Sequence, residues 1–175
     1  MQEPEVSLRI AMKYIQDHQT CNDVAVSIDG AHIKTKHIVH FDLMGFMLEN
    51  GYVKCDGDNE RWQGAYRSSC HVPRIIVSSR PGEGDVTITL NDGKILFIES
   101  KKFKSGSGGE YPAMREAIGQ LMTGCPDRPD VIPVVAVPHS AKSEELAQEW
   151  TSNERIRRAG IRFMLVRNDG SIEFI

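Results

Sequence analysis

The sequence predicts an α/β fold, with a mixed central β-sheet flanked by helices. Two β-rich runs around a tight turn, between residues 84 and 102, indicate an antiparallel pair. The continuous apolar run 131–138 follows a helical stretch, which is typical of a buried strand that pairs in parallel through a crossover. The expected order is helix, helix, three antiparallel strands, helix, strand, helix, strand, strand.

At 175 residues the chain is long enough for one domain with a sizeable core. We expect a single domain over residues 1–175 with its core at about 35–140, and with the N-terminal helix and the C-terminal strands as additions. The N-terminal helix is expected at 4–18, where Pro4 suits a first turn and apolar residues recur at helical spacing.

A second helix is expected at about 35–50, ending at the C-terminal signal Asn50-Gly51. Before it, residues 20–34 predict a loop with a short strand whose neighbours the sequence leaves open. Residues 74–79 predict the first of the three antiparallel strands, directly before the hairpin. The later elements are expected as a helix at 111–124, a strand at 131–138, a polar helix at 142–159 broken near Ser152-Asn153, and strands at 161–167 and 171–175.

The composition predicts a soluble cytoplasmic protein. No apolar run approaches the length of a membrane span, and the acidic, mixed N-terminus is unlike a signal peptide. The four cysteines lack C-x-x-C spacing, which argues for free thiols and against a zinc site. The net charge of −3 provides no global basic field. A nucleic-acid-binding function therefore requires local basic patches, or the longer footprint of a homodimer.

The hairpin between residues 84 and 102 organises the chain, and the length of its turn decides which side chains share a face. If Asp92-Gly93 alone were the loop, Asp85 and Glu99 would lie on opposite sides of the sheet. A three-residue loop, with Gly93 left-handed, pairs Leu90 with Lys94 and brings Asp85 beside Glu99. We expect the three-residue loop because it buries one apolar face.

Two neighbouring carboxylates repel each other and favour a cation between them. A hard divalent ion with oxygen ligands, most simply Mg²⁺, is the natural occupant. Lys101, two residues after Glu99, can hold a phosphate or position a water that the metal has made more acidic. Together these groups suit phosphodiester hydrolysis. The alternative is an ordinary solvated hairpin in which Glu99 pairs with Lys101, although residues 95–98 are apolar on both faces, as in a buried strand.

Asp85 after Gly84, followed by Glu99-Ser100-Lys101 and more weakly by Gln120, resembles the PD-(D/E)xK nuclease superfamily, which includes restriction enzymes and Holliday-junction resolvases. The resemblance implies a restriction-endonuclease-like core and a metal-dependent endonuclease. In that mechanism Asp85, Glu99 and the Ser100 carbonyl hold one or two Mg²⁺, for which Mn²⁺ can substitute. Lys101 positions the attacking water, and Gln120 aligns water or phosphate.

Two further features bear on the resemblance. The family's proline before the aspartate is replaced here by Gly84. The family often adds a carboxylate from an early helix to the metal site, and Asp42 or Glu49 in the expected helix 35–50 is a candidate, with a solvated helix flank as the alternative for each.

Expected contacts with nucleic acid come from two places. Lys102 and Lys104 extend the cationic patch around Lys101. Arg61 and Arg67 are interleaved with aromatic residues, which suits phosphate contacts and base stacking, or alternatively a strand that packs Trp62 into the core. The expected partner is nucleic acid, with DNA ahead of RNA. The alternative function is a catalytically inactive nuclease-like scaffold that binds nucleic acid or a protein.

Overall fold

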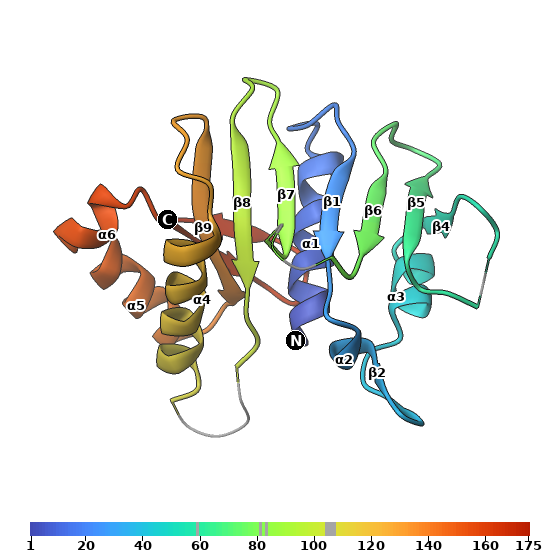
Figure 1. The fold of residues 1–175 in the computed structure, drawn as a ribbon, viewed down its shortest axis with the longest axis horizontal. Coiled ribbons are helices and arrows are strands. Elements are labelled where there is room, and N and C mark those ends of the chain that lie inside the picture. Colours follow the sequence, from blue (N-terminus) through green and yellow to red (C-terminus); the bar gives the residue numbers. More distant parts are fainter. Residues whose placement is uncertain (59, 81, 83, 104–107) are drawn as a thin grey trace.

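The computed structural model describes residues 1–58, 60–80, 82, 84–103 and 108–175. Within these ranges the strands form one large mixed sheet and a separate two-stranded ribbon. The strands of the large sheet are β1 (Val24–Ser27), β4 (Tyr52–Lys54), β5 (Gly64–Ser68), β6 (Ile75–Ser78), β7 (Val86–Thr89), β8 (Ile95–Ser100), β9 (Val131–Pro138), β10 (Arg162–Val166) and β11 (Ile172–Phe174). Their order across the sheet is β11-β10-β9-β8-β7-β1-β6-β5-β4 (Figure 1).

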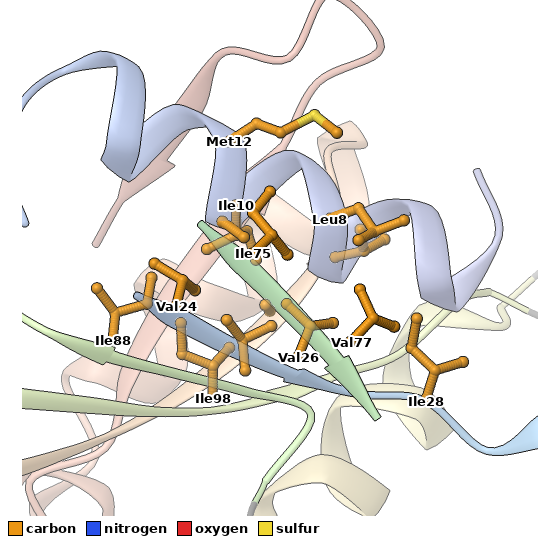
Figure 2. Packing of buried hydrophobic residues seen from close by; sticks show 14 of the residues in the cluster. Leu8, Ile10, Met12, Val24, Val26, Ile28, Ile75, Val77, Ile88 and Ile98 are labelled. Carbon is orange, nitrogen blue, oxygen red and sulfur yellow. The ribbon is translucent and has the colours of Figure 1, made fainter. Parts of the chain in front are cut away.

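Helices cover both faces of this sheet, as the sequence predicts. They are α1 (Glu3–Gln16), α2 (Gly30–Ile33), α3 (Leu43–Glu49), α4 (Glu110–Gly124), α5 (Ala141–Thr151) and α6 (Glu154–Arg158). Helix α1 packs on one face, where Leu8 and Ile10 lie over Val24 and Val26 of β1 (Figure 2). Helices α4 and α5 pack on the opposite face (Figure 1).

Strand β8 lies in the middle of the molecule and is apolar on both faces. Leu96 and Ile98 belong to the core under α1, whereas Phe97 belongs to the core under α4. The strand pairs antiparallel with β7 and parallel with β9, which confirms the predicted crossover through α4. A strand that is buried on both faces and paired on both edges is a rigid support for side chains at its end.

The three-residue loop of the β7–β8 hairpin is also confirmed. The Leu90 N–H donates to the Lys94 carbonyl at 2.7 Å, and Gly93 has a φ of +86°. Val86 then lies opposite Ile98. This turn requires a left-handed residue at its third position, and glycine adopts that conformation without the steric penalty that a side chain would bring.

The sequence predicts that residues 74–79 lie directly beside the hairpin as the first of three antiparallel strands. The structure has three such strands, but the first of them is β1 and not residues 74–79. Strand β1 lies between β6 and β7, pairing parallel with β6 and antiparallel with β7. The strands that run antiparallel next to the hairpin are therefore β1, β7 and β8, and β6 lies one position further out. Val24 and Val26 are fully buried against α1, so the burial of β1 under this helix settles a position that its four-residue pattern left open.

The expected helix at 35–50 is wrong in its first half. Residues Lys34–Thr35 and Ile38–Val39 form the strands β2 and β3 of the antiparallel ribbon. The helix begins at Leu43 because the Asp42 carboxylate accepts the Gly45 N–H at 3.0 Å and caps it. Its end at Asn50-Gly51 is confirmed, with Gly51 at a φ of +79°.

The C-terminal elements follow the prediction closely. The polar helix divides at Ser152-Asn153, where the Asn153 side chain accepts the Arg155 N–H and caps α6. Strands β10 and β11 continue the large sheet beyond β9, and α1 belongs to the main core, so sheet and core both extend outside residues 35–140. Among the described residues, no helix combines the length and the apolar character needed to cross a membrane.

Candidate active site

Asp85 and Glu99 lie side by side where the β7–β8 ladder ends. The Asp85 N–H donates to the Ile98 carbonyl at 2.9 Å, directly before Glu99, and the two acid side chains are in hydrogen-bonding contact. Val86 and Ile98 point into the core under α1, so the preceding and following acids point to the other face. The two acids are thus brought together by the register of the hairpin.

Burial and mutual repulsion disfavour charge on this pair. Burial is the main cause that raises the pKa of Asp85 to about 7, and the neighbouring Glu99 charge adds to it. Burial also raises the pKa of Glu99, and the Glu3 carboxylate contributes in the same direction. The Lys101 amine opposes both shifts. The pair therefore binds a proton more readily than two isolated carboxylates would.

Ser100 connects the two strands at this point. Its N–H donates a hydrogen bond of 2.7 Å to Oδ2 of Asp85. Because the N–H and C=O groups of a strand residue point to the same edge, the Ser100 carbonyl also faces the side of Asp85. The Ser100 hydroxyl is buried without a hydrogen-bond partner among the described residues.

Lys101 is only 7% exposed although it follows the end of β8. Its N–H donates to the Ala136 carbonyl of β9 at 2.9 Å, which continues the parallel pairing by one residue. Its amine lies 3.6 Å from Oε1 of Glu3. The amine is therefore close both to the first turn of α1 and to the Asp85–Glu99 pair, whose pKa values it lowers.

Glu3 is a site residue that the sequence argument missed. Besides facing Lys101, it accepts the Lys102 N–H at 3.4 Å, and its Oε1 lies 3.5 Å from Nδ1 of His32. An acid in the first turn of a helix is commonly explained by its favourable interaction with the helix dipole. That explanation accounts for Glu3 in the sequence without any role in a site. The signal that would have found it is the expectation of a carboxylate from an early helix.

Glu3 on α1, and neither Asp42 nor Glu49 of α3, lies at this site. Asp42 caps α3 through its own carboxylate, and Glu49 is exposed at the far end of the same helix. Neither residue is among those that line the two hollows around Asp85.

Two adjoining hollows meet at the acidic pair, with volumes of about 780 Å³ and 430 Å³. Both are lined by Asp29, Asp85 and Gln120. The larger hollow is also lined by Glu99, Lys34, Trp62 and Arg80, among others. The smaller one is also lined by Glu3, His32, Lys101, Lys102 and Glu116, among others. Because they share lining residues, the two hollows form a continuous polar depression across the end of β7 and β8.

The remaining predicted residues divide into three groups. Gln120 on α4 lines both hollows, and Lys102 lines the smaller one. Arg61 and Arg67 are exposed but are not among the lining residues, and Lys104 is outside the described residues. Two cations that the sequence argument did not select, Lys34 and Arg80, line the larger hollow. They come from segments far apart in sequence, so only the fold brings them to the site.

The backbone conformation at Gly84 is one that proline cannot adopt. Its φ is +70°, whereas proline is confined to about −65°. A Cβ atom on Gly84 would also lie 3.0 Å from the Phe97 ring. The chain therefore enters β7 through a conformation that excludes proline and disfavours any side chain.

The donor set is suited to a hard cation, although it is small. Within the described ranges, no group of three or more His, Cys, Asp or Glu side chains is arranged to hold a metal ion. Mg²⁺ in proteins is often held by only one or two carboxylates and keeps several waters. Asp85 and Glu99, which both line the larger hollow, are sufficient in number for that smaller requirement.

Comparison of the chain with protein-family models, with curated proteins and with solved structures found no match.

Proposed function

We propose that the protein is a metal-dependent endonuclease that hydrolyses phosphodiester bonds of nucleic acid, with a restriction-endonuclease-like core of the PD-(D/E)xK type. The observation that carries this proposal is the pairing of Asp85 and Glu99 beside the Lys101 amine, where two polar hollows meet. The order α1, three antiparallel strands β1-β7-β8, α4 and a parallel β9 agrees with the proposed core.

Asp85, Glu99 and the Ser100 carbonyl are the groups proposed to hold Mg²⁺. All three supply oxygen, the donor that this ion prefers, and all lie on the same side of the β8 end. When bound, the ion supplies Lewis acidity and lowers the pKa of water toward neutrality. The hydrogen bond from the Ser100 N–H keeps Asp85 oriented for this task without a second side chain.

Lys101 and Gln120 are the proposed catalytic partners. The Lys101 amine, held 3.6 Å from Glu3, lies on the acidic side of the site where it can orient the attacking water and offset charge on the phosphorane-like transition state. Gln120 lines both hollows and is suited to hydrogen-bond water or a phosphate oxygen. Glu3 positions the Lys101 amine and is the proposed early-helix carboxylate of the site.

A phosphate backbone requires cations along its path. Lys102 in the smaller hollow and Lys34 and Arg80 in the larger one supply them on both sides of Asp85. This local arrangement is compatible with a net charge of −3, because the phosphate-facing groups are collected at one edge of the sheet.

The alternative proposal is a catalytically inactive scaffold of the same type that binds nucleic acid or a protein. Two observations favour it: the described residues contain no group of three or more side chains that could hold a metal ion, and the Lys101 amine is engaged with Glu3. The first proposal predicts cleavage that depends on divalent ions, whereas the second predicts no cleavage.

The decisive experiment measures metal binding and cleavage together. We expect Mg²⁺ or Mn²⁺ to bind the wild-type protein in isothermal titration calorimetry, to bind Asp85→Asn and Glu99→Gln more weakly, and to support nicking of a supercoiled plasmid. Anomalous density between Asp85 and Glu99 in a Mn²⁺-soaked crystal is the structural counterpart. Metal binding that is equal in all three proteins would refute the assigned site, and binding without cleavage would favour the scaffold.

A further inference from the structure

The β2–β3 ribbon follows α2 and projects beyond the strand ends of the large sheet, next to the candidate site (Figure 1). All seven residues 34–40 are exposed, and they include Ile38 at 64% and Val39 at 59%. The base of the ribbon is fixed, because Ile33 is buried and its carbonyl accepts the His40 N–H at 2.9 Å. Two exposed apolar residues on an anchored projection require an explanation beyond folding.

The ribbon is also one-sided in charge. Residues 30–41 contain two lysines and three histidines but no aspartate or glutamate. The nearest acids in sequence, Asp29 and Asp42, lie outside this segment and cap helices by accepting the backbone N–H groups of Ala31 and Gly45. In a chain of net charge −3, this segment is complementary to a polyanion.

The location of the ribbon links it to the acidic pair. Gly30 and Lys34 line the same hollow as Asp85 and Glu99. A ligand held by the ribbon therefore continues directly into the proposed catalytic depression, with Arg80 on the same lining.

We propose that the ribbon inserts into a groove of double-stranded DNA and that duplex DNA is the substrate of this site. This inference rests on the proposed function only for its catalytic part. The major groove of B-DNA is wide enough for a two-stranded β-ribbon, whereas the deep and narrow major groove of A-form RNA is not. Lys34 and Lys36 contact phosphates, and Val39, which lies opposite Lys34 in the ribbon, meets the apolar edges of the bases, such as the methyl group of thymine.

The backbone at the ribbon tip supports a binding role. Lys36 has a φ of +53°, in a region that glycine and asparagine adopt far more readily than lysine. A lysine is thus held at an exposed turn in spite of backbone strain, and strain of this kind is concentrated at functional positions. Lys36→Gly removes both the strain and the cation, so it should leave the melting temperature unchanged or higher while it weakens DNA binding.

The test compares Lys34→Ala/Lys36→Ala with the charge-matched control Lys13→Ala/Lys94→Ala. The control lysines are Lys13, half-buried on the last turn of α1, and Lys94, exposed next to the β7–β8 turn, and neither lines the two hollows around Asp85. Fluorescence anisotropy with a labelled duplex of about 25 base pairs, in EDTA, measures binding over a range of salt concentrations. A duplex RNA of the same sequence is measured in parallel.

We expect the ribbon variant to bind duplex DNA roughly tenfold more weakly, with the slope of log affinity against log salt reduced by about 2, and the control to bind as the wild type does. Duplex RNA should bind more weakly than DNA to the wild type. Equal losses in both variants, equal affinity for RNA, or no DNA binding by the wild type would overturn the inference.

Plasmid nicking separates this inference from the proposed function. If the wild type nicks DNA and the ribbon variant nicks and binds equally well, the ribbon assignment is wrong and the nuclease assignment stands. If no variant nicks DNA with either metal while the ribbon variant alone loses affinity, the ribbon assignment stands and the nuclease assignment is wrong.

Discussion

The backbone N–H of Ser100 donates a 2.7 Å hydrogen bond to Oδ2 of Asp85, so the residue that ends β8 orients the carboxylate that precedes β7. This bond stabilises the charged form of Asp85, yet burial and the neighbouring Glu99 outweigh it and raise the pKa to about 7. The site therefore fixes the orientation of the Asp85 carboxyl group while it disfavours the charged form of that group.

Asp85→Asn should make the metal-free protein more stable at pH 7.5. The folded protein holds a proton on Asp85 up to about pH 7, whereas the unfolded chain releases it near pH 3.8. The contribution of this group to stability is therefore fully present below about pH 4 and is lost as the pH rises toward 7. Asparagine cannot ionise, and its side-chain oxygen can still accept the Ser100 N–H.

Urea unfolding in EDTA at pH 5 and pH 7.5 measures this effect. We expect the wild type to lose more stability than Asp85→Asn between these two values, and Mg²⁺ to restore part of the loss in the wild type alone. A wild type that gains stability over this range relative to the variant would contradict the burial of the charge.

Lys101→Met should abolish most cleavage, by about 10²-fold or more, because the amine that offsets transition-state charge is lost. Methionine retains much of the buried stem, so circular dichroism should show an intact fold. The pKa of Asp85, followed by NMR titration of its carboxyl carbon, should rise above that of the wild type because Lys101 lowers it. Lys102→Met is the matched control, and we expect it to raise KM more than it lowers kcat. Unchanged cleavage by Lys101→Met would end the nuclease proposal.

Glu3→Gln tests the carboxylate that the sequence argument missed. We expect roughly tenfold weaker Mg²⁺ binding, because groups that support a metal site commonly contribute a factor of this size. The pKa of Asp85 should fall, since the Glu3 charge raises it. Glu5→Gln is the control, because Glu5 is in the same first turn but pairs with Arg9 at 2.9 Å. Equal effects of the two changes would reduce Glu3 to a helix-dipole residue.

Gly84→Ala should destabilise the protein by about 1–3 kcal/mol more than Gly93→Ala. Both glycines have positive φ values, +70° and +86°, so both variants carry the backbone penalty. Only Gly84 would place its Cβ against the Phe97 ring, whereas Gly93 has nothing within 4 Å. The difference in the free energy of unfolding, from urea denaturation, isolates the steric part. Equal losses would show that Phe97 moves away at little cost.

The sequence was sufficient where local chemistry decides the structure. The parity of the Asn91-Asp92-Gly93 turn set the register that brings Asp85 to Glu99, because a slip of one residue reverses every face. The division of the last long helix at Asn153 was likewise readable from a capping residue.

The sequence was insufficient where distant segments meet. The four residues of β1 alternate correctly, but nothing in that pattern states that they lie between β6 and β7. Glu3 and Lys101 are close only because α1 packs across the sheet. The second helix begins later than the sequence predicts for a different reason. Apolar sequence in the ribbon lies by chance at helical spacing with the helix that follows, and the Asp42 cap marks the true start of that helix.

The insertion of β1 beside β7 sets a lower limit on how far the chain can be shortened. A fragment of residues 35–140 retains Asp85, Glu99, Lys101 and Gln120, but it leaves one edge of β7 unpaired and strips the apolar cover from β8. An uncovered edge beside bare apolar surface recruits other chains. We therefore expect that fragment to elute as high-molecular-weight aggregates in size-exclusion chromatography, which makes the first helix and strand obligatory parts of any minimal version of this protein.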